Sequence, residues 1–76
     1  MNLSHLKVGE EAKIVNFHDA HLSLKLLEMG FLPGTLVRLE SVAPLGCPIC
    51  VAIGSNYHLS LRKSEAATVE IERIDN

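Results

Sequence analysis

Apolar and polar residues alternate in five short stretches of the chain, and this period of two is typical of β-strands that bury one face. The alternation is clearest where Ile49, Val51 and Ile53 occupy every second position. The pattern predicts strands at residues 11–17, 37–42, 49–53, 57–61 and 69–72. Short strands at such spacing favour a small β-barrel or sandwich, and a barrel leaves fewer exposed strand edges. A single helical turn is expected at residues 63–66, just before the last strand.

One helix is predicted between the first two strands, at residues 20–29. Asp19 is suited to cap its start, because a short acidic side chain accepts a hydrogen bond from a free backbone N–H there. Gly30 stands just past its end, at a position where a positive φ is commonly needed. Phe31 follows and is placed to contact Leu26 across that helix end.

This helix carries two apolar stripes instead of one. At about 100° per residue, the two groups fall on nearly opposite sides of the helix. The first group is Leu22, Leu26 and Met29, and the second is Ala20, Leu24 and Leu27. A helix that rests on a small barrel needs a single apolar stripe. Either the flanking loops with Phe17 and Phe31 cover the second stripe, or Leu24 and Leu27 form an exposed patch that docks a partner or a second copy.

Size and charge limit the classes of protein to which the chain belongs. Its 76 residues suffice for one domain, expected to span residues 1–76, and a hydrophobic content of 47% argues against disorder. The net charge is −2 and the basic residues are scattered, so a nucleic-acid binder is not expected. No apolar run approaches the roughly 18 residues of a membrane span, and no signal peptide is evident at the start, so we expect a cytoplasmic protein.

No catalytic grouping stands out in the sequence. A glycine-rich phosphate loop with Lys-Ser or Lys-Thr is missing, and no Ser, His and acid set is evident. A chain this small also has little room for a deep pocket. We therefore expect a protein that is not an enzyme.

Cys47 and Cys50 have the spacing of one half of a structural zinc site. A complete site needs about four ligands, and the chain has no second cysteine pair. Three interpretations stay open at this point. The cysteines are ordinary loop and packing residues, they bind Zn²⁺ or Fe²⁺ weakly, or they have a disulfide or redox role.

Strand pairing adds His58 as a third candidate metal ligand. If Ile53 pairs with Tyr57 across a turn at residues 54–56, Cys50 lies opposite Ser60 and diagonal to His58. Both side chains then project from the same face, away from the core. A shift of the register by one residue would mix the two faces of the strand, so we prefer this pairing.

The helix end and the Ala-Pro-Leu-Gly segment make the chain resemble the ferrous iron transport protein A (FeoA) family. The matching residues are Leu3, Leu6, Gly9, Ala12, Lys13, Ile14, Leu26, Glu28, Met29, Gly30, Pro33, Gly34, Ala43, Pro44, Leu45, Gly46, Pro48, Leu59, Leu61, Arg62, Lys63, Glu65 and Ala66. They cover nearly the whole chain. The departure is Cys47, where the family usually has an Asp or a similar polar residue.

The resemblance implies a mainly β fold, a small SH3-like β-barrel of about five strands with one α-helix inserted after the first strand. It also implies a cytoplasmic accessory or regulatory protein at the inner face of the membrane. Its partner would be a membrane ferrous iron transporter that carries a GTP-binding domain. The helix and two loops would supply the partner contacts, which are Leu24, Leu27, Phe31, Leu32, Pro33, Pro44 and Leu45.

No cofactor is required on this interpretation, and the protein itself neither binds nucleic acid nor inserts into the membrane. Weak Fe²⁺ or Zn²⁺ binding at Cys47, Cys50 and His58 and formation of a homo-oligomer stay open. Two alternative functions also stay open. One is a metal-sensing module related to the SH3-like domain of iron-dependent repressors, and the other is a zinc or redox module built on Cys47 and Cys50.

Overall fold

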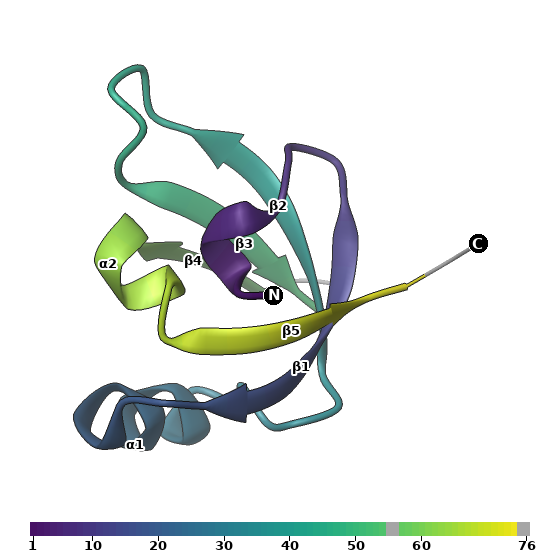
Figure 1. Cartoon of the computed structure of the whole chain (residues 1–76), viewed down its shortest axis with the longest axis vertical. Helices are drawn as coiled ribbons and strands as arrows, with labels where there is room; N and C mark the ends of the chain where they lie inside the picture. The colour runs from purple at the N-terminus through teal and green to yellow at the C-terminus, as the bar shows by residue number, and fades with distance from the viewer. Residues whose placement is uncertain (55–56, 75–76) are drawn as a thin grey trace.

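The computed structural model describes residues 1–54 and 57–74 (Figure 1). The elements in chain order are η1 (Leu3–His5), β1 (Glu11–Phe17), α1 (Ala20–Glu28), β2 (Leu36–Val42), β3 (Ile49–Ile53), β4 (Tyr57–Leu61), α2 (Lys63–Ala66) and β5 (Val69–Arg73). All five predicted strands and both helices are confirmed. α1 is one residue shorter than predicted because Met29 is its C-cap. Of the turn predicted at residues 54–56, positions 55 and 56 lie outside the described residues.

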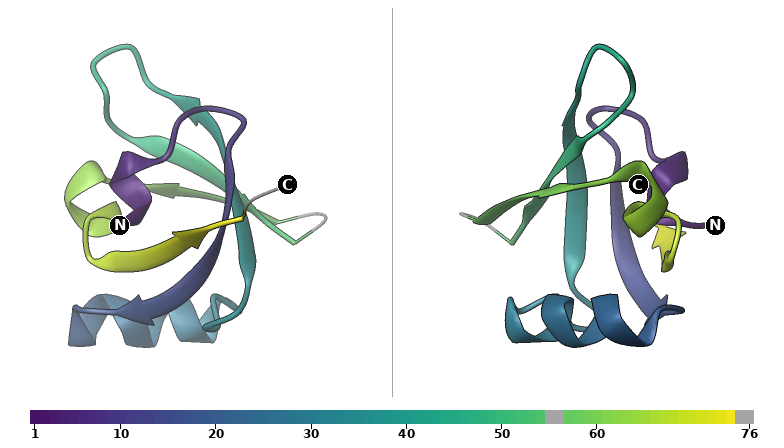
Figure 2. Two further views of the ribbon diagram at one scale, coloured as in Figure 1. Left: turned by 45° about the vertical axis from the view of Figure 1, so that its right-hand side comes forward. Right: turned by 90° about the vertical axis from the view of Figure 1, so that its left-hand side faces the viewer.

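The five strands form one antiparallel sheet in the order β4-β3-β2-β1-β5. Irregularities in the pairing, between Ile14 and Asn16 in β1 and between Leu39 and Ser41 in β2, mark β-bulges, which strengthen the local twist and bend of a sheet. Figures 1 and 2 show the strands curling around a common interior. Among the described residues β4 and β5 do not pair, so the barrel stays open along one seam.

The interior of this open barrel is apolar. Its residues come from every strand, from α1, α2 and η1, and from the loops next to η1 and α1. They are Leu3, Leu6, Ala12, Ile14, Leu26, Phe31, Val37, Leu39, Ile49, Val51, Ile53, Leu61, Ala66, Val69 and Ile71. In the part of the chain that the structure describes, no polar or charged residue is buried. No helix in this part is long and apolar enough to cross a membrane.

The two edges of the sheet differ in how they are covered. The chain start lies along the outer edge of β5, where Asn2 forms an isolated bridge with Glu70 and the N–H of Ile71 donates to the carbonyl of Met1 at 2.9 Å. At the other edge, β4 has β3 as its only strand neighbour among the described residues. An edge of this kind presents N–H and C=O groups that can pair with another strand.

The end of α1 has the geometry that its sequence predicts. Gly30 has a φ of 91°, in the left-handed region. Its N–H donates to the carbonyl of Leu27 at 3.1 Å, and the N–H of Phe31 donates to the carbonyl of Leu26 at 2.9 Å. These two bonds define a Schellman motif, which satisfies carbonyl groups that a helix end leaves free. Leu26 and Phe31 both belong to the core, so the motif also fixes the chain direction after the helix.

Replacing this glycine tests how much the helix end contributes to stability. We expect Gly30→Ala to lower the free energy of unfolding by about 1–2 kcal/mol, because an alanine at positive φ is strained. An added Cβ would meet no atom within 4 Å, so the loss reports the backbone alone. Urea denaturation followed by circular dichroism measures it. An unchanged midpoint would contradict the prediction.

Candidate functional site

The second apolar stripe of α1 is exposed. Leu26, in the first stripe, is buried, whereas Leu24 is 64% exposed and Leu27 is 39% exposed. Leu22 is half-buried and packs against the core. The interpretation that Phe17, Phe31 and the flanking loops cover the second stripe is therefore wrong. In this chain taken alone, Leu24 and Leu27 face solvent, as the alternative interpretation predicts.

Phe31 does not belong to this exposed surface. Its exposure is 0%, and it is the largest of the fully buried side chains. Its assignment as a partner contact is corrected, because the Schellman motif turns the side chain into the barrel interior. Leu32 and Pro33, the next two residues, are exposed. Leu24, Leu27 and Leu32 are named the helix surface below.

The loop between β2 and β3 presents a second exposed apolar group. The N–H of Gly46 donates to the carbonyl of Ala43 at 2.7 Å, which closes a turn with Pro44 at its second position, where proline is favoured. Leu45, the next residue of this turn, is 97% exposed. Pro44 and Leu45 are named the hairpin tip below.

The helix surface and the hairpin tip lie at opposite ends of the molecule. All views in Figures 1 and 2 place α1 at the bottom and the β2–β3 loop at the top. The predicted contacts on the helix and on the β2–β3 loop therefore face opposite ends of the molecule. A flat partner surface that contacts Leu24 and Leu27 does not reach Leu45 at the same time.

The three candidate metal ligands are not gathered into one site. The Cys47 thiol lies at the start of α2, where it accepts a hydrogen bond from the N–H of Lys63 at 3.4 Å. Cys50 lies within β3, opposite Ser60 of β4, and His58 pairs with Ala52, so the predicted register is confirmed. Nevertheless, among residues 1–54 and 57–74 no three His, Cys, Asp or Glu side chains are placed to hold a metal ion. The predicted three-ligand set of Cys47, Cys50 and His58 is therefore corrected.

His58 lies beside an acidic side chain instead of a thiol. The Nδ1 atom of His58 is 4.0 Å from a carboxylate oxygen of Glu40, and both side chains are substantially exposed. Cys47 and Cys50 are both free thiols. Cys50 lies within β3, whereas Cys47 precedes β3 and its thiol lies at the start of α2.

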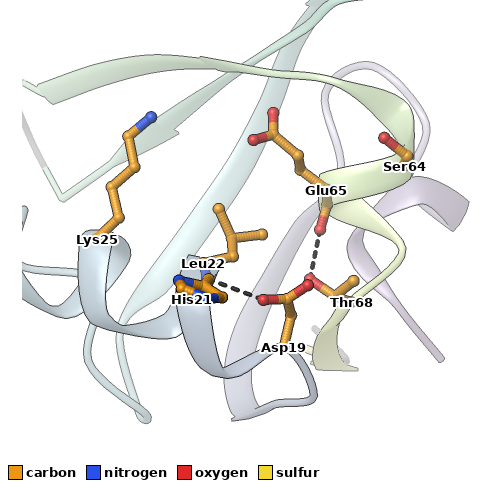
Figure 3. Close-up of a pocket in the computed structure, with 7 residues that line it drawn as sticks. All are labelled: Asp19, His21, Leu22, Lys25, Ser64, Glu65 and Thr68. Atoms are coloured by element: carbon orange, nitrogen blue, oxygen red, sulfur yellow. Dashed lines mark hydrogen bonds between the residues drawn. The ribbon is translucent and has the colours of Figure 1, made fainter.

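A cavity that was not predicted from the sequence lies between α1 and α2 (Figure 3). It has a volume of about 420 Å³ and is open to solvent. The α1 side contributes Asp19, Leu22 and Lys25, and the α2 side contributes Ser64 and Glu65. These two groups are about forty residues apart in the chain, so no local pattern joins them. This cavity is named the α1–α2 groove below.

Charged groups surround the apolar floor of this groove. One carboxylate oxygen of Asp19 accepts the N–H of Leu22 at 3.0 Å, which confirms Asp19 as the helix cap. One oxygen of Glu65 accepts the N–H of Arg62 at 2.8 Å. The second oxygen of each carboxylate has no hydrogen bond within the described residues. The Lys25 side chain extends from α1 across the groove toward β4, as Figure 3 shows.

The fold and the exposed apolar residues define a class of protein. Five antiparallel strands in this order, with one helix after the first strand and a short one before the last, form a small SH3-like domain. The family model of the FeoA domain matches residues 1–73, so the chain belongs to the FeoA family. The predicted family and fold are both confirmed.

Relatives of known name support this assignment. The chain is 38% identical over 77 residues to an Fe(2+) transport protein A/Fe(2+) transporter FeoB fusion protein of Porphyromonas gingivalis. The aligned part is 100% of this chain and 9% of the fusion protein. It is 43% identical to iron(II) transport protein A of Clostridium thermocellum, with a TM-score of 0.88 over 97% of the chain and 46% of that protein. The chain thus spans less than half the length of these two relatives.

A third relative links the family to a metal ion. FeoA of Stenotrophomonas maltophilia is 32% identical, with a TM-score of 0.81 over 95% of the chain and 89% of that protein. Its structure is a complex with zinc, and it is described as an SH3 domain protein and a candidate ferrous iron transport activating factor. A zinc complex therefore exists in the family, and no cofactor requirement follows from it.

A metal-dependent repressor contains a domain with the same fold as this chain. A manganese-dependent transcriptional repressor matches 97% of the chain and 36% of its own length, with a TM-score of 0.86 and 17% identity. At this identity the likeness concerns the fold alone.

Proposed function

We propose that this protein is a cytoplasmic accessory module that binds a bacterial membrane ferrous iron transporter at its inner face. The transporter carries its own GTP-binding domain, and binding affects its GTP-dependent activity or its assembly. The module itself is not an enzyme and supplies contacts only. These functions go beyond the family assignment, which links the chain to ferrous iron transport.

One observation carries the proposal, namely the fusion of a homologous domain to FeoB in Porphyromonas gingivalis. Two modules in one polypeptide meet at an effective concentration in the millimolar range, so even a weak contact between them is populated. The fusion therefore supports an interface between a FeoA domain and the transporter to which it is joined.

The helix surface is the part of the chain best suited to this interface. Leu24 and Leu27 expose apolar groups on α1, whose other side is anchored in the core through Leu26, and Leu32 is exposed in the segment that follows the helix. A rigid element that presents apolar side chains loses little conformational entropy on binding. Grouped exposed apolar residues also mark protein interaction sites.

A calorimetric titration tests the proposal. The protein is titrated against the full-length transporter and against its isolated GTP-binding domain, with and without GTP. We expect saturable binding to the full-length transporter. Binding to neither partner in any nucleotide state would overturn the proposed function.

The same titration tests the zinc or redox alternative. We expect the double variant Cys47→Ser, Cys50→Ser to bind the transporter within about twofold of the wild type, because neither thiol lies on the helix surface. Its fold is checked by circular dichroism. A loss of more than tenfold in a folded variant would favour a role of the two cysteines in binding.

A further inference from the structure

The exposed stripe of α1 lies at one end of the molecule. In Figures 1 and 2, α1 is the lowest of the described helices and strands, and the sheet lies above it. Leu26 is buried on the side of α1 that faces the sheet, and Leu24 is exposed. At about 100° per residue, these two side chains point about 160° apart. The stripe with Leu24 and Leu27 therefore faces away from the rest of the chain and is accessible to a second molecule.

An imidazole and a carboxylate flank this stripe on one side of α1. His21 and Glu28 are both exposed and are seven residues apart, so they lie within about 20° of each other around the helix. At a rise of about 1.5 Å per residue they are about 10 Å apart along it, too far to contact each other. Within the described residues neither forms an ion pair. Both side chains are therefore available to another molecule.

The other cation of α1 lies outside this flank. Lys25 lines the α1–α2 groove, which His21 also borders. Figure 3 shows the Lys25 side chain extending across the groove toward β4 and away from the exposed stripe. The charged groups nearest to the stripe on α1 are therefore His21 and Glu28.

The helix surface is complementary to a second copy of itself. In a two-fold symmetric contact, if one residue contacts another, the second contacts the first across the axis. Two antiparallel α1 helices with the axis beside Leu24 bring their apolar stripes together. His21 and Glu28 lie almost equally far from Leu24 in opposite directions along the chain, so each His21 then lies beside Glu28 of the other copy.

Two electrostatic terms favour this antiparallel arrangement. A neutral imidazole still carries one N–H, which can donate to a carboxylate, so each His21–Glu28 contact supplies a hydrogen bond. The positive N-terminal end of each helix dipole also lies beside the negative C-terminal end of the other. A parallel arrangement would place like ends together.

We propose that the protein forms a two-fold symmetric dimer through α1. Leu24 and Leu27 of the two copies are in contact, and two His21–Glu28 hydrogen bonds lie at the rim. Stable interfaces bury about 1,200–2,000 Å² in total, and a contact centred on a few exposed leucines falls below this size. The dimer is therefore weak, with a Kd on the order of 0.1–1 mM.

This dimer covers the surface that the proposed function assigns to the transporter. Two copies joined through α1 do not present Leu24 and Leu27 to another protein. The transporter therefore competes with self-association, and a weak dimer yields to it. The competition rests on the proposed function, whereas the dimer itself does not.

Sedimentation velocity of the isolated protein tests the dimer. Between about 10 µM and 1 mM we expect the sedimentation coefficient of the wild type to rise with concentration. Leu24→Glu should stay monomeric, because its two carboxylates would meet at the axis. Val8→Glu, a similar change at an exposed position outside α1, should associate like the wild type. A wild type that is monomeric at 1 mM, or association that Leu24→Glu leaves unchanged, would overturn the inference.

An exchange of charges tests the antiparallel arrangement. We expect His21→Glu to weaken the dimer at least about fivefold, because it sets carboxylates side by side at both rims. The double variant His21→Glu, Glu28→Lys should return the Kd to within about twofold of the wild type. Positions 21 and 28 do not touch within one copy, so this recovery arises across the interface.

His58→Glu is the matched control, since it makes the same substitution on β4 instead of α1. It should change the Kd less than about twofold. Circular dichroism checks that each variant is folded. A double variant that does not recover, or an equal loss with His58→Glu, would overturn the proposed arrangement.

Dimer formation and transporter binding are measured separately. A dimer whose chain does not bind the transporter would leave the inference standing and overturn the proposed function. Transporter binding by a chain that is monomeric at 1 mM would do the reverse. Where both occur, saturating transporter should lower the dimer fraction, and an unchanged fraction would overturn the shared surface.

Discussion

Phe31→Ala is expected to lower the urea midpoint of unfolding strongly. Phe31 has no exposed surface, and truncation of a buried Phe to Ala typically lowers the free energy of unfolding by about 3–5 kcal/mol. A domain of this length has a total stability of roughly 4–11 kcal/mol. The loss therefore removes a large part of the total. Urea denaturation followed by circular dichroism measures the midpoint for the variant and for the wild type.

The neighbouring residue supplies the control for this variant. Leu32 is 53% exposed, so Leu32→Ala should change the free energy of unfolding by no more than about 0.5 kcal/mol. The two variants are one position apart and both remove an apolar side chain. Equal, small losses for both would mean that Phe31 is not a core residue.

The strands and their pairing were predictable because burial follows the alternation of the sequence. In β3 the buried residues are Ile49, Val51 and Ile53, which are the positions that the pattern selects. The same alternation fixes the register with β4, since a slip by one residue would turn the apolar side chains outward. Local chemistry likewise predicted the cap at Asp19 and the turn at Gly30.

Phe31 shows where the prediction from sequence contradicted itself. The helix-end pattern assigned Phe31 to a contact with Leu26, and the resemblance assigned it to a partner surface. One side chain does not satisfy both, and the structure shows the core assignment. The contact with Leu26 follows from a defined backbone motif, whereas exposure depends on how the rest of the chain covers a residue.

The candidate site was harder to predict because it depends on the placement of distant segments. The hairpin tip and the helix surface were both predicted to contact the partner, yet the barrel separates them by its whole height (Figure 1). The α1–α2 groove is lined by Asp19 and Lys25 from the α1 region and by Glu65 from α2, which follows about forty residues later in the chain. No periodicity within either segment indicates that they meet. Spacing and strand pairing also suggested a metal site at Cys47, Cys50 and His58, but among the described residues no three such side chains are placed to hold a metal ion.

Leu24→Glu is expected to weaken binding to the transporter by about 10- to 100-fold while the domain stays folded. Leu24 is 64% exposed and lies outside the core, so a carboxylate there remains hydrated in the free protein. In the complex the same carboxylate is buried against an apolar surface, and burial of an unpaired charge is strongly unfavourable. The titration against the full-length transporter measures the loss, and circular dichroism shows whether the variant is folded.

Two further variants locate the interface. Val8 is 61% exposed, close to the value for Leu24, so Val8→Glu matches the change in both exposure and charge. It should leave the affinity within about twofold of the wild type. Leu45→Glu at the hairpin tip should behave like Val8→Glu, because one partner surface at α1 does not reach the opposite end of the barrel. A large loss with Leu45→Glu and none with Leu24→Glu would move the interface to the hairpin tip, and unfolding of Leu24→Glu would show that the second stripe of α1 belongs to the core.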